Sequence, residues 1–308
     1  MGRRHTFLLA AAAATLAALA GCTGGAAEGV PERRATSPTA SPTPTPPPQL
    51  PRGGRTLFPA YRVVAHYGGS GGPSLGVLGR GAPDQAAAAI EKRAQAYAFA
   101  GRPVQPAMEL ITTVALDAPG PDGTYSSRGN PQAVERYLAA AKRHRMLLVL
   151  DFQPGRGDFL GQVRRFERFL REPEVGVALD PEWRMSAGQR PGQVIGSASA
   201  ASINEVSAYL AALVEKHRLP EKLFVVHQFR PSMLPDRERI VARPGLATVF
   251  HADGNGPVTT KKESYARLDL PGAPFRVGFK VFLRADPVLM SPQAVMALRP
   301  QPDLVTYQ

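Results

Sequence analysis

The chain has 308 residues, with 37 Lys or Arg and 25 Asp or Glu, which gives a formal net charge of +12 at pH 7. This length is sufficient for a large domain with its own hydrophobic core. The basic balance suits an anionic neighbourhood such as lipid headgroups, wall phosphates or acidic glycans. Nucleic acid is not expected as a partner, because no run of Lys and Arg is interleaved with aromatic residues.

The N-terminus has the pattern of an export signal. Arg3 and Arg4 precede an apolar stretch from Phe7 to Leu19, and the sequence Leu19-Ala20-Gly21-Cys22 follows. The apolar stretch is too short to cross a bilayer of about 30 Å as a helix. Residues 1–21 resemble a bacterial lipoprotein signal peptide. The resemblance implies cleavage before Cys22 and lipidation of its thiol, which would anchor the chain to the extracytoplasmic face of the cell membrane.

A change in composition separates this signal from the rest of the chain. The stretch up to about Arg55 is rich in Ala, Thr, Ser and Pro, and it cannot bury a core. Its prolines favour an extended spacer. We therefore expect a lipoprotein signal peptide at 1–21, a disordered Pro-rich linker at 22–55 and a folded domain at 56–308. Cys22 is the only cysteine, so no intramolecular disulfide is available to the domain.

Short apolar runs alternate with helical patterns from residue 56 onward. The runs predict eight strands, at 61–67, 108–116, 146–152, 175–181, 223–228, 246–251, 276–282 and 304–307. The helical patterns predict seven helices, at 84–99, 131–144, 158–171, 200–217, 235–241, 261–268 and 292–298.

This alternation implies right-handed βαβ units and a parallel sheet. Eight units in a domain of this size predict a TIM-like (β/α)8 barrel of the α/β class, with the last helix missing after residue 307. The alternative is an open doubly wound sheet. It is disfavoured because the loop Gly68–Pro73 lacks the spaced glycines of a nucleotide-binding loop.

Many of the predicted strands end in polar or charged residues. If the barrel closes, these residues gather at one mouth and form a substrate-binding set: His66, Tyr67, Gln153, Trp183, His227, Asp253, Lys280 and Tyr307. Taken singly, each has an ordinary explanation, such as a helix cap or a core histidine. Taken together, they indicate a site, because burying so many polar groups without a purpose is costly.

Asp180 and Glu182 lie two residues apart at the end of the fourth strand, on one face of it. Crowding raises the pKa of one carboxyl of such a pair, so that one group donates a proton and the other stays charged. The pair resembles the closing Asp-x-Glu of family 18 chitinases and of some barrel lysozymes. The resemblance implies Glu182 as the general acid and Asp180 as the acid that orients the substrate's acetamide. The earlier acids of that family's motif are replaced here by Val175 and Ala178.

A second resemblance covers the whole chain. Segments at 151–156, 179–183 and 226–229 are similar to those of a set of uncharacterised actinobacterial lipoproteins. This resemblance implies a lipoprotein and brings no known activity.

Three functions are compatible with these patterns. We favour a wall-facing glycoside hydrolase that acts on an N-acetylated or acidic cell-wall polysaccharide, without cofactor or metal. Its expected catalytic residues are Glu182, Asp180 and Asp151, and Asp151 or Asp253 would supply the second carboxylate of a two-carboxylate scheme.

The second function is a divalent-metal hydrolase with oxygen and imidazole ligands. Its candidate ligands are His66, Asp151, Asp180, Glu182, His227 and Asp253, although the sequence lacks His-x-His after its first strand and His-Glu-x-x-His anywhere. The third is a non-catalytic barrel that binds a glycan or a wall protein. Lys280 favours this third function, because many barrel glycosidases carry a carboxylate on the seventh strand.

Overall fold

Eight parallel strands close into a barrel in the computed structural model, which describes residues 46–99, 101–120, 122–268 and 274–308. Each strand pairs with the next one in the chain, and the eighth pairs with the first. The strands are β1 Arg62–Gly68, β2 Val104–Thr113, β3 Leu147–Phe152, β4 Val175–Leu179, β5 Lys222–Gln228, β6 Leu246–Ala252, β7 Arg276–Val281 and β8 Leu304–Tyr307. The expected TIM-like barrel is confirmed.

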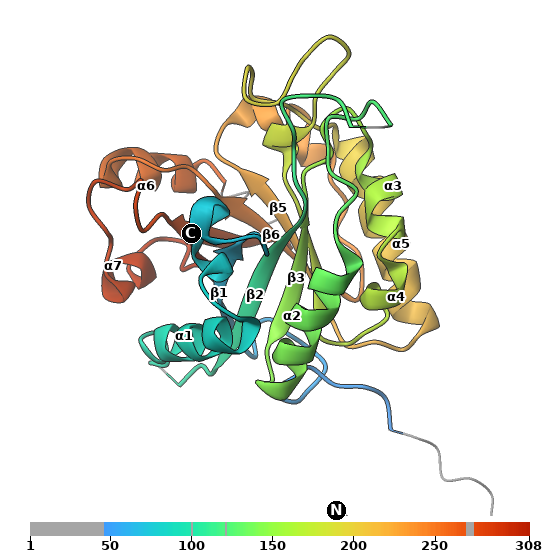
Figure 1. Cartoon of the computed structure of the whole chain (residues 1–308). Coiled ribbons are helices and arrows are strands. Elements are labelled where there is room, and N and C mark those ends of the chain that lie inside the picture. Colours follow the sequence, from blue (N-terminus) through green and yellow to red (C-terminus); the bar gives the residue numbers. More distant parts are fainter. Residues whose placement is uncertain (1–45, 100, 121, 269–273) are drawn as a thin grey trace, which may run out of the picture. The chain divides into compact units, whose positions relative to one another are not determined.

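Helices cover the outside of the strands, with α3, α4 and α5 on one side and α6 and α7 on another (Figure 1). Their bounds are α1 Pro83–Gln95, α2 Pro131–Arg143, α3 Phe159–Arg164, α4 Glu167–Leu170, α5 Ala200–Lys216, α6 Val258–Ala266 and α7 Pro292–Met296. Among the described residues no helix follows β8, and none is both long and apolar enough to span a membrane.

Side-chain caps explain where several helices begin. Asn130 accepts a hydrogen bond from the Ala133 amide at the start of α2, and Ser199 accepts one from the Ser202 amide at the start of α5. Asp158 caps α3 in the same way, through the Gly161 amide. The single helix expected at 158–171 is divided into α3 and α4.

The helix expected at 235–241 is wrong, because the segment holds only a 3₁₀ turn at Arg237–Arg239. Two backbone hydrogen bonds within the segment form this turn, and further hydrogen bonds join the segment to α5. Asn204 donates to the Arg239 carbonyl and accepts from the Val241 amide, while Asp236 accepts from the Ala200 amide. These tertiary bonds replace the hydrogen bonds that a helix would make.

The second strand begins four residues earlier than expected, at Val104. Gln105 and Pro106 obscure its start, because a polar residue and a proline are unusual inside a strand. Gln105 is nevertheless buried, and its amide donates to the Arg145 carbonyl. At the other end Val114 leaves the barrel, where its amide bonds to the Ser127 hydroxyl.

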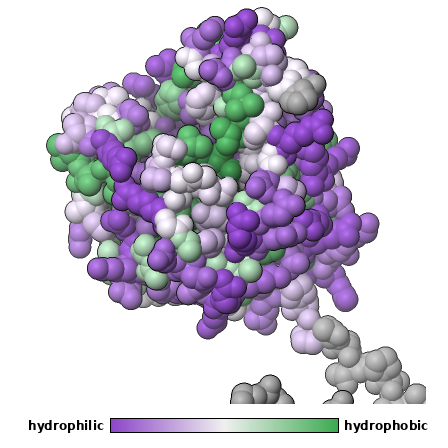
Figure 2. All heavy atoms as spheres, in the orientation of Figure 1, coloured by the Kyte–Doolittle hydropathy of each residue, from purple (hydrophilic) through white to green (hydrophobic). Residues whose placement is uncertain are grey.

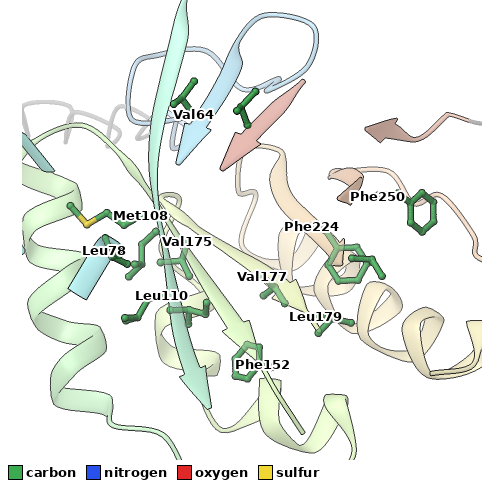
Figure 3. Close-up of a cluster of buried hydrophobic side chains, with 14 of the residues drawn as sticks. Val64, Leu78, Met108, Leu110, Phe152, Val175, Val177, Leu179, Phe224 and Phe250 are labelled. Atoms are coloured by element: carbon green, nitrogen blue, oxygen red, sulfur yellow. The ribbon is translucent and has the colours of Figure 1, made fainter. Parts of the chain in front are cut away.

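Alternate residues of each strand enter two separate apolar clusters. Val64, Met108 and Phe152 belong to the larger cluster, which fills the space between the strands and the surrounding helices (Figure 3). Val63 and Ala65 face the other way, into the barrel, where the smaller cluster forms. Both faces of the strands are therefore apolar, as expected for a parallel sheet covered on both sides.

The segment before β1 closes the amino end of the barrel. Leu50, Leu57 and Phe58 are buried in the inner cluster, and Glu221 accepts hydrogen bonds from the amides of Leu57 and Phe58. The folded unit therefore begins at Pro46 and includes residues that the sequence placed in the linker. The composition of 46–55 hid this, because a few apolar side chains suffice to dock a proline-rich segment. The expected signal peptide, Cys22 and the expected linker up to Thr45 lie outside the described residues.

Hydrophilic side chains dominate the face seen in Figure 2, and hydrophobic ones gather mainly in its upper half. The surface is mainly hydrophilic because most of the aliphatic side chains are buried in the two apolar clusters.

Candidate active site at the carboxyl ends of the strands

Polar side chains fill the carboxyl half of the barrel interior, above the inner apolar cluster. They continue the inward alternation of each strand: on β1, Val63 and Ala65 lead to Tyr67, and on β5, Leu223 and Val225 lead to His227. The inner polar set is Tyr67, Glu109, Asp151, Asp180, His227, His251, Asp253, Lys280 and Thr306, all of them buried.

Four of these side chains form a chain of ion pairs across the barrel. His227 Nε2 lies 2.8 Å from Glu109 Oε1, and His227 Nδ1 lies 2.9 Å from Asp253 Oδ2. The second oxygen of Asp253 lies 2.9 Å from Lys280 Nζ. Because both ring nitrogens of His227 face carboxylates, the imidazole is held as the doubly protonated cation.

The charges of these ion-paired side chains stabilise one another. Although burial opposes the charged form, Lys280 and His227 hold the pKa of Asp253 well below its usual range. Against the same cost of burial, Asp253 and Glu109 raise the pKa of His227 well above its usual value. Burial and the cationic His227 lower the pKa of His251, whose Nε2 lies 2.9 Å from the Thr306 hydroxyl.

Tyr67 links these ion pairs to the acids on β3 and β4. Its hydroxyl donates to Asp151 Oδ2 over 2.9 Å, and Lys280 Nζ lies 3.5 Å from the centre of its ring. The Gln153 amide lies 3.4 Å from the Tyr67 hydroxyl and 3.5 Å from Asp180 Oδ2. Burial raises the pKa of Asp151 to about 7, and the charge of Glu109 adds to the shift.

A cavity of about 560 Å³ opens at the end of the barrel next to these groups. Tyr67, Gln153, Glu182, Trp183, Asp253 and Lys280 contribute to its wall. Asp180 and Asp151 are not among its lining residues, and both are almost fully buried. Asp253 is therefore the ionised carboxylate that a bound molecule can reach.

Glu182 lies in a 3₁₀ turn, Pro181–Trp183, directly after β4. Burial and the nearby charge of Asp253 together raise its pKa to about 7. Burial and the charge of Glu182 likewise raise the pKa of Asp180 well above its usual range. One oxygen of each of Asp180, Glu182 and Asp253 lies within 4.8 Å of the others. The cavity thus presents an acid that holds its proton near neutral pH beside one that stays charged.

The structure brings most of the expected site residues together. Tyr67, Gln153, Trp183, Asp253, Lys280 and Glu182 line the cavity, and His227 lies beneath them in contact with Asp253. Asp180 and Asp151 belong to the same cluster below the cavity wall.

His66 and Tyr307 do not belong to this site. They lie on the outer face of β1 and β8, where their rings are 6.3 Å apart, and the Tyr307 hydroxyl lies 2.5 Å from that of Tyr97. Burial and the charges of Arg93 and Arg80 lower the pKa of His66 to about 4. The strand alternation sends His66 outward because its neighbour Tyr67 points inward.

Glu109, His251 and Thr306 belong to the cluster but were not predicted. Glu109 is an acid between the apolar residues Met108 and Leu110 of a strand, and this position could have indicated a buried charge. His251 is the last residue of the expected sixth strand, where a lone histidine in an apolar run is typical of an ordinary core residue. Thr306 carries no such signal, since threonine is common in strands.

Comparison of the chain with models of known protein families gives no match, and comparison with curated proteins gives none either. The class that the fold defines is a TIM-like α/β barrel. Function is therefore argued from the geometry of the site.

Proposed function

We propose that the barrel is a glycoside hydrolase that acts on a cell-wall polysaccharide at the carboxyl ends of its strands. The observation that carries this proposal is the pairing of Glu182, with its pKa near 7, and the ionised Asp253 in the wall of one cavity. Trp183 lies in the same wall, and its ring offers an apolar surface for a sugar face.

In this proposal Asp253 attacks the anomeric carbon while Glu182 protonates the glycosidic oxygen, so that the glycosidic bond breaks and the leaving sugar departs as an alcohol. Water, deprotonated by Glu182, then attacks the same carbon, breaks its bond to Asp253 and releases the second sugar. The oxygens of Glu182 and Asp253 lie within 4.8 Å, which is closer to the separation of about 5 Å in retaining enzymes than to the roughly 6.5–9.5 Å of inverting ones. His227 and Lys280 keep Asp253 ionised and orient it. Asp180 and Asp151 serve as positioning residues, because both are buried beneath the cavity wall.

We further propose that the chain is a lipoprotein on the extracytoplasmic face of the cell membrane, anchored by a lipid on Cys22. The support is the sequence of residues 1–22 and the proline-rich stretch that follows. Labelling of cells with a radioactive fatty acid tests this: the chain takes up label, whereas Cys22→Ser does not. Label on the Cys22→Ser variant would contradict the anchor.

Turnover by the purified full chain tests the enzymatic proposal. Reducing ends should appear when the chain is incubated with N-acetylated or acidic wall polysaccharides. Glu182→Gln should lower the rate at least about 100-fold, since general acid catalysis contributes roughly 10²–10⁴-fold. The matched control, Glu205→Gln on the exposed face of α5, should leave it unchanged. Full activity of Glu182→Gln would refute the assignment.

A metal-dependent hydrolase is the second candidate, since oxygens of Asp180, Glu182 and Asp253 could converge on one cation. Two expected ligands do not fit: His66 lies outside the barrel, and both nitrogens of His227 already face carboxylates. The Lys280 ammonium group also forms an ion pair with Asp253 Oδ1, and its positive charge would repel a divalent ion. A stoichiometric metal that chelators remove together with activity would favour this candidate.

A non-catalytic glycan-binding barrel is the third candidate. It is favoured by Lys280 on β7, where many barrel glycosidases carry a carboxylate. Binding of a wall polysaccharide without any turnover, unaffected by Glu182→Gln, would support it over the hydrolase.

A further inference from the structure

A second cavity, of about 430 Å³, adjoins the one that holds Glu182. The two cavities share Phe229, Arg230, Ser264 and Arg267 as lining residues, so they lie side by side. The second cavity lies between the segment after β5 and the carboxyl end of α6. A glycan bound with its scissile bond at Glu182 would extend into it.

Three arginines line this second cavity, against one acid, Glu238. Arg230 has no carboxylate within ion-pair distance among residues 46–308 that the structure describes. Arg237 bonds only to neutral oxygens, those of the Gln228 amide and the Arg267 carbonyl. Arg267 forms an ion pair with Glu263 over 3.9 Å, and both side chains of this pair are largely exposed. Among the described residues, the three arginines of this cavity therefore outnumber the two acids that lie near them, Glu238 and Glu263.

Aromatic rings hold two of these guanidinium groups in place. Arg230 lies 5.6 Å from the centre of the Phe229 ring, and Arg237 lies 5.3 Å from that of Phe250. The N–H groups of Arg237 are engaged with Gln228 and the Arg267 carbonyl, whereas Arg230 and Arg267 donate no side-chain hydrogen bond within the part of the chain that the structure describes, so their N–H groups are available for a ligand. Guanidinium edges pair with carboxylate and phosphate oxygens through two parallel hydrogen bonds.

We propose that this arginine-lined cavity is a subsite for an anionic unit of the glycan, next to the unit that is cleaved. The unit carries either a uronic acid carboxylate or a phosphate ester, which present the same pair of oxygens to a guanidinium group. The position of this subsite next to the cleaved bond rests on the proposed function. Binding of the anion itself does not require that function.

Calorimetric titration of the full chain in neutral detergent tests the subsite, using three oligosaccharide probes. The probes are a polyuronate oligomer, its carboxyl-reduced neutral counterpart and an oligomer with phosphodiester linkages. An anionic probe should bind at least tenfold more tightly than the neutral one, and its affinity should fall as salt is added. The anionic probe that binds more tightly identifies the natural substituent.

Arg230→Gln and Arg267→Gln should each weaken anion binding about tenfold and leave neutral binding unchanged. Arg136→Gln, which removes an exposed arginine on α2, is the matched control and should change neither. The subsite proposal would be overturned if the charged and neutral probes bound with equal affinity. It would also be overturned if Arg136→Gln weakened anion binding as much as Arg230→Gln and Arg267→Gln do.

The same measurements separate this inference from the proposed hydrolase. If an anionic probe binds through Arg230 and Arg267 but the wild-type chain never cleaves it, the subsite stands and the hydrolase fails. If neutral glycans are cleaved and neither arginine affects binding or turnover, the hydrolase stands and the subsite fails.

Discussion

Lys280 and Asp253 form an ion pair inside the barrel, with Lys280 Nζ 2.9 Å from Asp253 Oδ1 and both side chains almost inaccessible to solvent. The pair joins β7 to the end of β6 at the floor of the candidate site. Because His227 contacts the other oxygen of the same carboxylate, Asp253 is balanced by two cations. This balance keeps a buried carboxylate charged in the wall of the cavity.

Removal of Lys280 should destabilise the fold. Lys280→Met leaves Asp253 with a single cationic neighbour, and breaking a buried pair costs about 3 kcal/mol. Denaturant unfolding measures this difference in the free energy of unfolding. Lys262→Met, an exposed lysine on α6, is the control and should change stability by less than about 0.5 kcal/mol. A loss below about 1 kcal/mol in Lys280→Met would show that the pair contributes little.

The proposed hydrolase should lose activity as the pH rises through about 7. Glu182 must be protonated to act as the general acid, and burial raises its pKa to about 7. Asp253 should set no limit between pH 5 and 7, because His227 and Lys280 hold its pKa well below its usual range despite burial. The dependence of kcat/KM on pH measures both effects. A rate that stays constant from pH 5 to pH 9 would exclude Glu182 as the acid.

Stability should fall between about pH 4 and pH 7. Burial raises the pKa of Asp151 to about 7, so the folded state keeps a proton that the unfolded chain releases above about pH 4. The unfolded state is therefore favoured as the pH rises through this window, by up to about 1.4 kcal/mol per pH unit for such a group. Glu182 acts in the same direction.

Asp151→Asn tests the origin of this slope, because it removes the titration and keeps an acceptor for the Tyr67 hydroxyl. Unfolding measured at several pH values should show a shallower fall than in the wild type. Glu205→Gln should leave the slope as it was. An unchanged slope in Asp151→Asn would mean that its proton is not retained on folding.

The segment before β1 should contribute to stability although it precedes the barrel. Leu57 is fully buried in the inner cluster, and truncation of such a leucine to alanine costs about 3 kcal/mol. Leu289, which is 49% exposed, offers a matched control, and Leu289→Ala should cost less than about 0.5 kcal/mol. Equal losses in the two variants would show that residues 46–61 do not close the barrel in solution.

The sequence by itself determined the order of strands and helices, and with it the barrel. Apolar runs such as 175–179 alternate with helical patterns, and parallel strands joined by helices have few ways to pack. It also located Asp180 and Glu182, because an acid pair that ends a buried strand is conspicuous. The helix expected at 235–241 failed because Asn204 and Asp236 form tertiary bonds that no local pattern reveals.

Only the tertiary structure decided which strand residues face the site. His66 and Tyr67 are neighbours in β1, yet one points outward and the other inward. Alternation cannot be read from this strand, because both of its faces are buried and apolar. The partners of His227 were equally hidden, since Glu109 lies 118 residues away in the chain and meets it only when the barrel closes. The charges at the site depend on that closure, because removal from water and the contacts between strands set them.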